Sequence, residues 1–153
     1  MDDMVVRSLA KWPNVPAVYG WLALDRRGSW RIKGERITNP AFRDFIARNY
    51  GGDERGCWYF QNGPQRVYVE LAYTPFVLHY EGDRLFDHCG HPAEALETWL
   101  DDEGSVLIRA PQGIGLLDDR DLERYADSGD QLPRIARAEI PSRFGFIQDP
   151  KKT

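Results

Sequence analysis

The chain has 153 residues, of which 20 are basic and 24 acidic, and its formal net charge is −4. Proteins that bind nucleic acid draw most of their affinity from an excess of basic residues, so this balance argues against a nucleic-acid partner. No apolar run approaches the roughly 20 residues that cross a bilayer, so we expect no membrane insertion. Two cysteines, Cys57 and Cys89, are too few for a disulfide framework, and we expect a cytoplasmic protein with reduced thiols.

The length favours a single compact domain over residues 1–148, followed by a flexible tail over residues 149–153. An alternative organisation has two lobes, a hairpin with a helix at residues 12–56 and a β-rich lobe at residues 57–148. Aromatic side chains make up 12% of the chain. Such large rings let a short sheet bury much apolar area, so we expect the fold to depend on them.

The first elements are predicted before residue 34. Residues 3–11 have the apolar spacing of a short amphipathic helix. Residues 18–24 and 29–33 are predicted to be two strands joined by a turn at residues 25–28. The same Asp-x-x-Gly pattern returns at residues 101–104. A duplicated hairpin-plus-helix unit and independent reuse of a common turn both explain this echo.

A helix is predicted to follow, with clear signals at both ends. Asn39 is suited to accept a backbone N–H bond at the N-cap, and Pro40 is tolerated at the first helical position. An apolar stripe continues from Phe42 to Tyr50, and Gly51-Gly52 is expected to end the helix.

The centre of the chain is predicted to form an antiparallel meander. Strands at residues 58–60 and 66–71 flank Asn62-Gly63, a dipeptide that accepts the positive φ values of a tight hairpin turn. A third strand is expected at residues 76–80. Apolar and polar side chains alternate through residues 66–71, which is typical of a strand with one buried face.

The C-terminal half is predicted to add further short elements. The expected strands are residues 84–86, 95–100, 105–110 and 135–140, with a capped helix between residues 118 and 125. Residues 92–100 also suit a helix, because they are rich in Ala, Glu and Leu. We therefore predict an α+β fold, mainly an antiparallel sheet in the form of a meander or partly closed barrel, with two or three short helices.

Several motifs follow one another between residues 20 and 80. They are Asp25-x-x-Gly28-x-Trp30, Gly34-x-x-Ile37, a helix with Phe42 and Phe45, Tyr59 and Pro64, Val67-x-Val69-Glu70, and Pro75-Phe76-Val77. This set resembles a bacterial family of small uncharacterised proteins, found in proteobacteria and known as a domain of unknown function. The resemblance implies a β-rich fold with two small lobes, of which the second resembles ligand- and peptide-binding modules. It also implies a loose link to signalling, and it brings no catalytic residue.

The densest group of reactive side chains is the loop from Asp87 to His91. His88, Cys89 and His91 are residue types that bind zinc, and a cysteine beside a histidine is the pattern of a nucleophilic pair. Adjacent side chains usually point apart, and no second pair of ligands is present at a suitable spacing. A polar loop with a partly buried thiol explains the same residues. We therefore keep a small metal-dependent or Cys/His-dependent enzyme only as an alternative, and we expect no cofactor.

The central strands present aromatic side chains on both sides. Trp58 and Phe60 must face away from Tyr59, because neighbouring residues of a strand point to opposite faces. Either the helix that begins at Pro40 covers one face, or an aromatic patch is exposed. In the second case the predicted binding surface consists of Trp58, Phe60, Arg66, Tyr68 and Glu70.

These features favour a non-catalytic module that binds a small ligand or a protein partner, with a role in signalling or regulation as one use. A homodimer that pairs through an exposed face is a further alternative. The sequence contains no assembled catalytic motif, so we do not expect an enzyme.

Overall fold

The computed structural model describes residues 13–151. The chain divides into two compact units. Unit 1 contains the residues up to 25, residues 29–72 and the residues from 147, and unit 2 contains residues 26–28 and 73–146. Strands 58–71 therefore lie in unit 1, whereas the two-lobe alternative placed them in a second lobe that begins at residue 57. The helix predicted at residues 3–11 lies outside the described residues.

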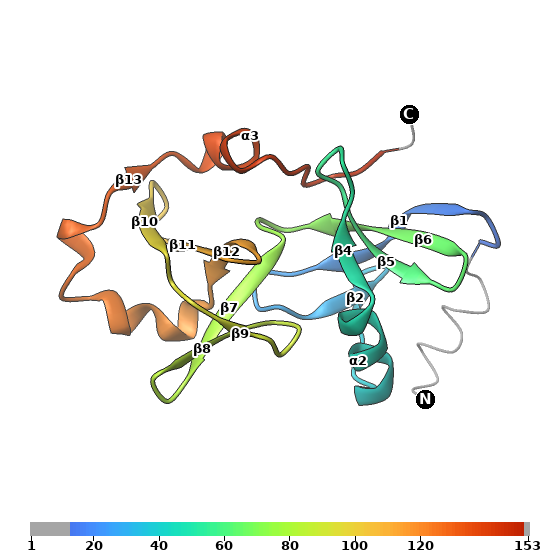
Figure 1. The fold of residues 1–153 in the computed structure, drawn as a ribbon, viewed down its shortest axis with the longest axis horizontal. Helices are drawn as coiled ribbons and strands as arrows, with labels where there is room; N and C mark the ends of the chain where they lie inside the picture. Colours follow the sequence, from blue (N-terminus) through green and yellow to red (C-terminus); the bar gives the residue numbers. More distant parts are fainter. Residues whose placement is uncertain (1–12, 152–153) are drawn as a thin grey trace. The chain divides into compact units, whose positions relative to one another are not determined.

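Unit 1 is built on a six-stranded sheet in the order β3-β2-β1-β6-β5-β4 (Figure 1). Its strands are β1 (Ala17–Leu24), β2 (Trp30–Ile32), β3 (Glu35–Arg36), β4 (Tyr50–Gly52), β5 (Trp58–Asn62) and β6 (Gln65–Leu71). β1 and β6 run parallel, and the other neighbours are antiparallel. The register of β1 against β6 shifts between Val18 and Leu22, where Gly20 has a φ of +78°.

The helix α2 (Pro40–Arg48) begins as predicted. The Asn39 side chain accepts the N–H of Phe42 at 2.9 Å, and Pro40 occupies the first turn. The helix ends earlier than expected. Residues 50–52, which were predicted to be its last residue and its terminator, form β4 instead, because their backbone pairs with β5.

The helix covers one face of this sheet. Phe60 of β5 is buried and meets the rings of Phe42 and Phe45 edge-on, with centroids 6.5 and 5.4 Å away. Phe60 is paired with Val67 of β6, and cross-strand partners lie on the same face. Coverage of one sheet face by the helix is thus confirmed, and it makes this face the core of unit 1.

Unit 2 is built on a seven-stranded sheet in the order β13-β10-β11-β12-β7-β8-β9. Its strands are β7 (Phe76–Glu81), β8 (Arg84–Asp87), β9 (Pro92–Ala93), β10 (Glu97–Asp101), β11 (Val106–Ala110), β12 (Gly113–Leu117) and β13 (Arg134–Ile135). The hairpin reading of residues 95–110 is confirmed, and the helical alternative at residues 92–100 is wrong.

The predicted meander needs one correction. β5 and β6 form the expected hairpin, but β7 does not pair with β6. β7 instead pairs in parallel with β12 and antiparallel with β8. The other side of β6 is taken by β1. The α+β class and the mainly antiparallel pairing are confirmed, and neither sheet closes into a barrel.

The remaining helices are short. They are the 3-10 helices η1 (Asp119–Tyr125), η2 (Gly129–Gln131) and η3 (Arg137–Glu139) and the α-helix α3 (Ile140–Phe144). The predicted cap of η1 is present, since the Asp118 side chain accepts the N–H of Arg120 at 2.9 Å. The strand expected at residues 135–140 is wrong beyond Ile135, where the chain turns into η3 and α3. Within residues 13–151, no helix has both the length and the apolar character needed to cross a bilayer.

One turn is used four times to join antiparallel strands. It has the pattern Asp-x-x-Gly-x, and it occurs at residues 25–29, 53–57, 87–91 and 101–105. In each copy the aspartate Oδ1 accepts the N–H of the residue four positions later, at 2.8–3.0 Å. The glycine of each copy has a φ between +83° and +90°, a conformation that other residues rarely adopt. The side chain thus closes the turn while the glycine reverses the backbone.

Two glycines of this turn provide a matched pair. Gly28 and Gly104 have the same φ of +83°, but an added Cβ would meet His88 Cβ at 2.8 Å only at Gly28. We expect Gly104→Ala to lower the free energy of unfolding by about 1–2 kcal/mol through backbone strain alone. Gly28→Ala should lower the free energy of unfolding by about 1–3 kcal/mol more than Gly104→Ala does, because its new methyl group overpacks against His88. Urea unfolding measures both values, and equal losses would contradict this account.

Candidate functional site

The structure divides the five residues of the predicted binding surface between the two faces of the unit 1 sheet. Phe60 lies on the core face, and Trp58, two residues away on the same strand, shares that side and packs at a tilt against Tyr50, with ring centroids 5.1 Å apart. Arg66, Tyr68 and Glu70 lie on the opposite face of β6, away from buried Val67 and Val69. The structure therefore brings together only the second group.

A cluster of tyrosines occupies that outer face. Tyr68 is paired across the strands with Tyr59, and their rings meet edge-on at 6.0 Å. Tyr19 of β1 stacks on Tyr68 with a centroid distance of 4.7 Å and an interplanar angle of 7°. Tyr68 is consequently 6% exposed, although no helix of unit 1 packs on it among the described residues. Tyr19 and Tyr59 remain partly exposed around it.

Two arginines lie over these rings. The guanidinium of Arg66 is 4.3 Å from the centroid of Tyr59, and that of Arg55 is 5.5 Å from the centroid of Tyr68. Contact with the Tyr19 and then the Tyr68 hydroxyl raises the pKa of Arg55, and contact with the Tyr68 hydroxyl raises the pKa of Arg66. Each guanidinium group thus lies over a ring of the cluster, Arg55 over Tyr68 and Arg66 over Tyr59. We call Tyr19, Arg55, Tyr59, Arg66 and Tyr68 the tyrosine–arginine face.

Asp53 holds two members of this face, Arg55 and Tyr68, through hydrogen bonds to its carboxylate. It opens the second of the four turns, and its Oδ1 accepts the N–H groups of Arg55 and Cys57, both at 2.9 Å. Its Oδ2 accepts the Tyr68 hydroxyl and the Arg55 guanidinium, each at 3.3 Å. Burial raises the pKa of the Asp53 carboxyl, but the two amides and the Arg55 side chain outweigh it, so the net pKa lies below the ordinary value. Asp53 is thus an ionised acceptor that orients Arg55 and Tyr68.

Three members of the face, Tyr19, Arg55 and Tyr59, are not part of the surface predicted from the sequence, although strand geometry already turns Tyr59 away from Trp58 and Phe60. Tyr19 lies beside Tyr68 because it follows Ala17 and Val18, which pair in register with Arg66 and Val67, and no local pattern in the sequence indicates the parallel pairing of β1 with β6. Arg55 is placed by the turn at residues 53–57. The repeated Asp-x-x-Gly pattern was a usable signal for Arg55, since it fixes the turn that presents this side chain.

The loop from Asp87 to His91 is the third copy of the same turn. The Asp87 carboxylate is buried and already accepts the N–H groups of Cys89 and His91 and the side chain of Gln112. The Nδ1 atom of His88 accepts the N–H of Val77 at 3.2 Å, and His91 projects outward. The polar groups of this loop therefore form hydrogen bonds within the turn, to Gln112 and to the strand β7, and they do not surround a shared ligand position.

The enzyme alternative gains no support from this geometry. Within residues 13–151, no three His, Cys, Asp or Glu side chains are grouped so that they could hold a metal ion. Burial raises the pKa of the Cys89 thiol to about 12, so the reactive thiolate is scarce at neutral pH. His79, the remaining histidine, lies beside Glu81 on β7.

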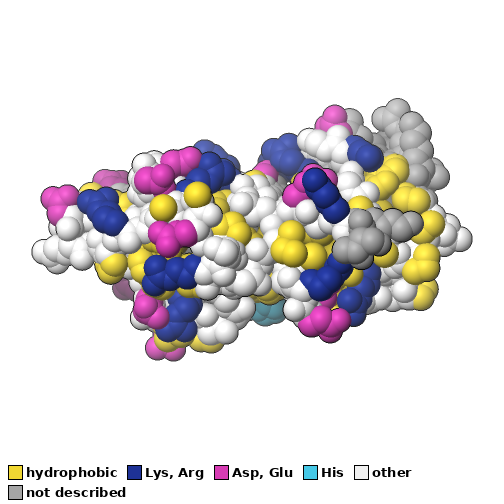
Figure 2. Space-filling view, turned by 90° about the horizontal axis from the view of Figure 1, so that it is seen from above, with side chains coloured by type: hydrophobic (Ala, Val, Ile, Leu, Met, Phe, Trp, Pro, Cys, Tyr) yellow, Lys and Arg dark blue, Asp and Glu magenta, His cyan; other side chains and the backbone are white. Residues whose placement is uncertain are grey.

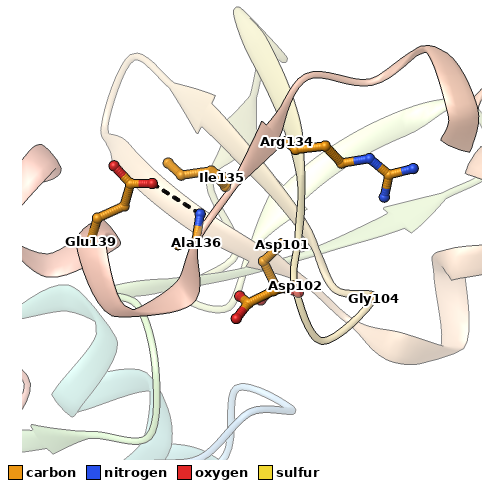
Figure 3. A pocket seen from close by; sticks show the side chains of 7 residues that line it. All are labelled: Asp101, Asp102, Gly104, Arg134, Ile135, Ala136 and Glu139. Carbon is orange, nitrogen blue, oxygen red and sulfur yellow. Dashed lines mark hydrogen bonds between the residues drawn. The ribbon is translucent and has the colours of Figure 1, made fainter.

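A shallow pocket of about 460 Å³ lies in unit 2, between the turn after β10 and the segment from β13 to η3 (Figure 3). Its lining includes Asp101, Asp102, Arg134 and Glu139. Asp101 accepts the Tyr73 hydroxyl at 2.7 Å and two amides of its own turn. Asp102 accepts the N–H of Arg137, and Glu139 accepts the N–H of Ala136. These carboxylates close turns and cap a helix, so the pocket is explained by local structure.

The fold and this outer face define a small α+β protein built on two mainly antiparallel sheets. A family model for DUF2944, described as "Protein of unknown function (DUF2946)", matches residues 1–151, and the chain belongs to this family. No curated protein matches the chain.

Two solved structures of DUF1285 family proteins are similar in fold. The protein from Silicibacter pomeroyi DSS-3 has a TM-score of 0.56 and 17% identity, over 83% of this chain and 84% of its own. The protein from Shewanella baltica OS155 has a TM-score of 0.53 and 14% identity, over 69% of this chain and 90% of its own. At such identities the likeness establishes the fold alone.

The role of Asp53 gives a pH-dependent prediction. Because the pKa of Asp53 is lowered in the folded state, its stabilising effect is complete above the unfolded pKa of about 4 and is lost as pH falls through the lower, folded value. Asp53→Asn should therefore lower the free energy of unfolding by about 1–3 kcal/mol at pH 7.

The difference from the wild type should shrink as the pH falls from about 4 through the lower, folded pKa of Asp53, below which both side chains are neutral. Asp53→Ala, which also removes the acceptor for the two amides, should be less stable than Asp53→Asn at every pH. Denaturant unfolding between pH 3 and pH 7 measures these values. A gap between the wild type and Asp53→Asn that does not change with pH would contradict the assignment.

Proposed function

We propose that the protein is a non-catalytic binding module and that the tyrosine–arginine face holds its partner. The observation that carries this proposal is the convergence of two guanidinium groups and three tyrosine rings on one side of the unit 1 sheet. Tyrosine and arginine are the side chains that most often dominate binding energy at protein interfaces. A binding role of this kind suits a regulatory or signalling protein of the cytoplasm, where Cys57 and Cys89 stay reduced.

The support of the face on regular structure favours binding. Tyr59 and Tyr68 are held on neighbouring strands whose opposite side carries the core residues Phe60 and Val67. Side chains held on such a base lose little conformational freedom when a partner binds, so more of the contact energy appears as affinity. Among the described residues, the candidates for chemistry offer no comparable arrangement.

Photo-crosslinking tests this proposal in the host cell. Gln61 is the cross-strand partner of Arg66 and therefore borders the face, whereas Asp44 is exposed on α2. A benzophenone amino acid at Gln61 should give a discrete protein adduct after irradiation, and the same amino acid at Asp44 should not.

Arg66→Ala in the Gln61-labelled protein should reduce that adduct. The adduct's mass and peptides, read by mass spectrometry, identify the partner, and twice the chain mass would place a homodimer contact on this face. Equal adducts from both positions, or an adduct that Arg66→Ala leaves unchanged, would contradict a binding role for the tyrosine–arginine face.

A further inference from the structure

The exposed charge of the tyrosine–arginine face is positive, although the chain as a whole is acidic. Asp53 is its nearest negative group, and the Asp53 side chain is 5% exposed and engaged by the turn, Arg55 and Tyr68. Arg55 and Arg66 are exposed. Among the described residues, no carboxylate oxygen lies within 4.0 Å of the Arg66 guanidinium.

This positive charge stands out against its surroundings. Figure 2 shows acidic and basic side chains interspersed on the face that it presents. Unit 2 holds fifteen acidic residues against nine basic ones, a net charge of −6, so unit 1, with nine acidic and eleven basic residues, carries a net charge of +2. The charge of unit 1 therefore favours an anionic partner, and Arg55 and Arg66 bring two of its positive charges together on the tyrosine–arginine face.

The rings prepare both arginines for a carboxylate. A guanidinium that stacks flat on an aromatic ring keeps its N–H groups directed outward in its own plane. The guanidinium carbon of Arg66 lies 4.3 Å from the centroid of the Tyr59 ring, and Arg55 contacts the Tyr68 ring and Asp53. Their side-chain entropy is already reduced before binding, which lowers the cost of forming a charge-assisted hydrogen bond.

Gly51 leaves open space beside the Tyr59 ring on the outer face. Gly51 of β4 is the cross-strand partner of Tyr59, so both belong to the outer face. A Cβ built on Gly51 would meet no atom within 4 Å, whereas one on Gly52 would meet Trp58 at 3.0 Å on the other face. β4 is also the last strand in the order of its sheet. An apolar side chain of an extended segment can therefore rest on Tyr59 above Gly51.

We propose that the tyrosine–arginine face binds an acidic segment of a protein partner. This inference rests on the proposed function and names the chemistry of the partner. A carboxylate of the segment pairs with the guanidinium of Arg66, a second carboxylate reaches Arg55, and an apolar or aromatic residue lies over Tyr59 beside Gly51. The segment is recognised by its negative charge and by the flat aromatic base beneath it.

Glu70 limits where that negative charge can lie. It is on the same face of β6 as Arg66, four residues away, which is about 13 Å along a strand. Its carboxylate repels an acidic group at that end of the face. Removal of the charge by Glu70→Gln should therefore strengthen binding of an acidic segment, whereas a partner that is not acidic would gain nothing.

The test uses the full-length, ¹⁵N-labelled protein and three blocked octapeptides. The peptides alternate tyrosine with glutamate, with glutamine or with lysine, so only their charge differs. The glutamate peptide should shift the Nε–Hε signals of Arg55 and Arg66, and it should bind at least about tenfold more tightly than the glutamine peptide, as a charge-assisted hydrogen bond is worth about 1.5–3 kcal/mol. Added salt should weaken it.

Three variants and one control locate the site. Arg66→Gln and Gly51→Gln should each weaken binding of the glutamate peptide, and Glu70→Gln should strengthen it. Arg48→Gln removes an exposed arginine from α2 and should leave the affinity unchanged. Unfolding midpoints near that of the wild type confirm that each variant is folded.

The outcomes separate this inference from the proposed function. If the glutamine or lysine peptide binds as tightly, or if no peptide binds while the Gln61 adduct forms, the face binds a partner but the acidic class is wrong. A separate titration uses inorganic phosphate at the same concentration as the peptides. If phosphate alone shifts both arginine signals as strongly as the peptide, the site takes a free anion and the proposal of a protein segment falls.

Discussion

The pairing of Phe60 with Val67 decides which side chains of the unit 1 sheet are buried. Because the period of a strand is two, this pair sends Phe60 to the core, where Phe42 and Phe45 of α2 cover it. The next pair, Tyr59 with Tyr68, must then face outward. A slip of one residue would exchange the two sets, so the aromatic core and the aromatic face are specified together.

The outward pair becomes a site because of what surrounds it. Tyr19 is brought in by the parallel pairing of β1 with β6, and Arg55 is brought in by the Asp53 turn. The carboxylate of Asp53 links this turn to the Tyr68 hydroxyl. Tyr68, the most buried ring of the face, is therefore held both by the Asp53 turn, through its hydroxyl, and by the pairing of β6 with its neighbouring strands.

Much of the local structure follows from the sequence. The cap at Asn39, the hairpin across Gly63 and the alternation of β6 are local signals, and the structure contains all three. Opposite facing of Phe60 and Tyr59 also follows from strand geometry alone. The helix end was missed because Tyr50 continues an apolar helical stripe, while its backbone is taken by a pairing with β5 that no local pattern reveals.

The site was harder to predict than the fold. Arg66, Tyr68 and Glu70 share a face by alternation, but their neighbours come from β1 and from the turn after β4. Trp58 and Phe60 were grouped with them as aromatic residues close in sequence, although parity places both on the core side. The Asp87 loop is one of the four Asp-x-x-Gly turns, and the turn uses the Asp87 carboxylate and the backbone N–H groups of Cys89 and His91 rather than their side chains.

The central claim is that the rings hold the arginines in place before any partner binds. Relaxation of the Arg66 Nε–Hε group in the free protein measures this directly. We expect an order parameter near the roughly 0.85 of rigid backbone in the wild type, falling below about 0.6 when Tyr59→Leu removes the stacking ring. An Arg66 side chain that is already mobile in the wild type, or equally ordered in both proteins, would contradict the account.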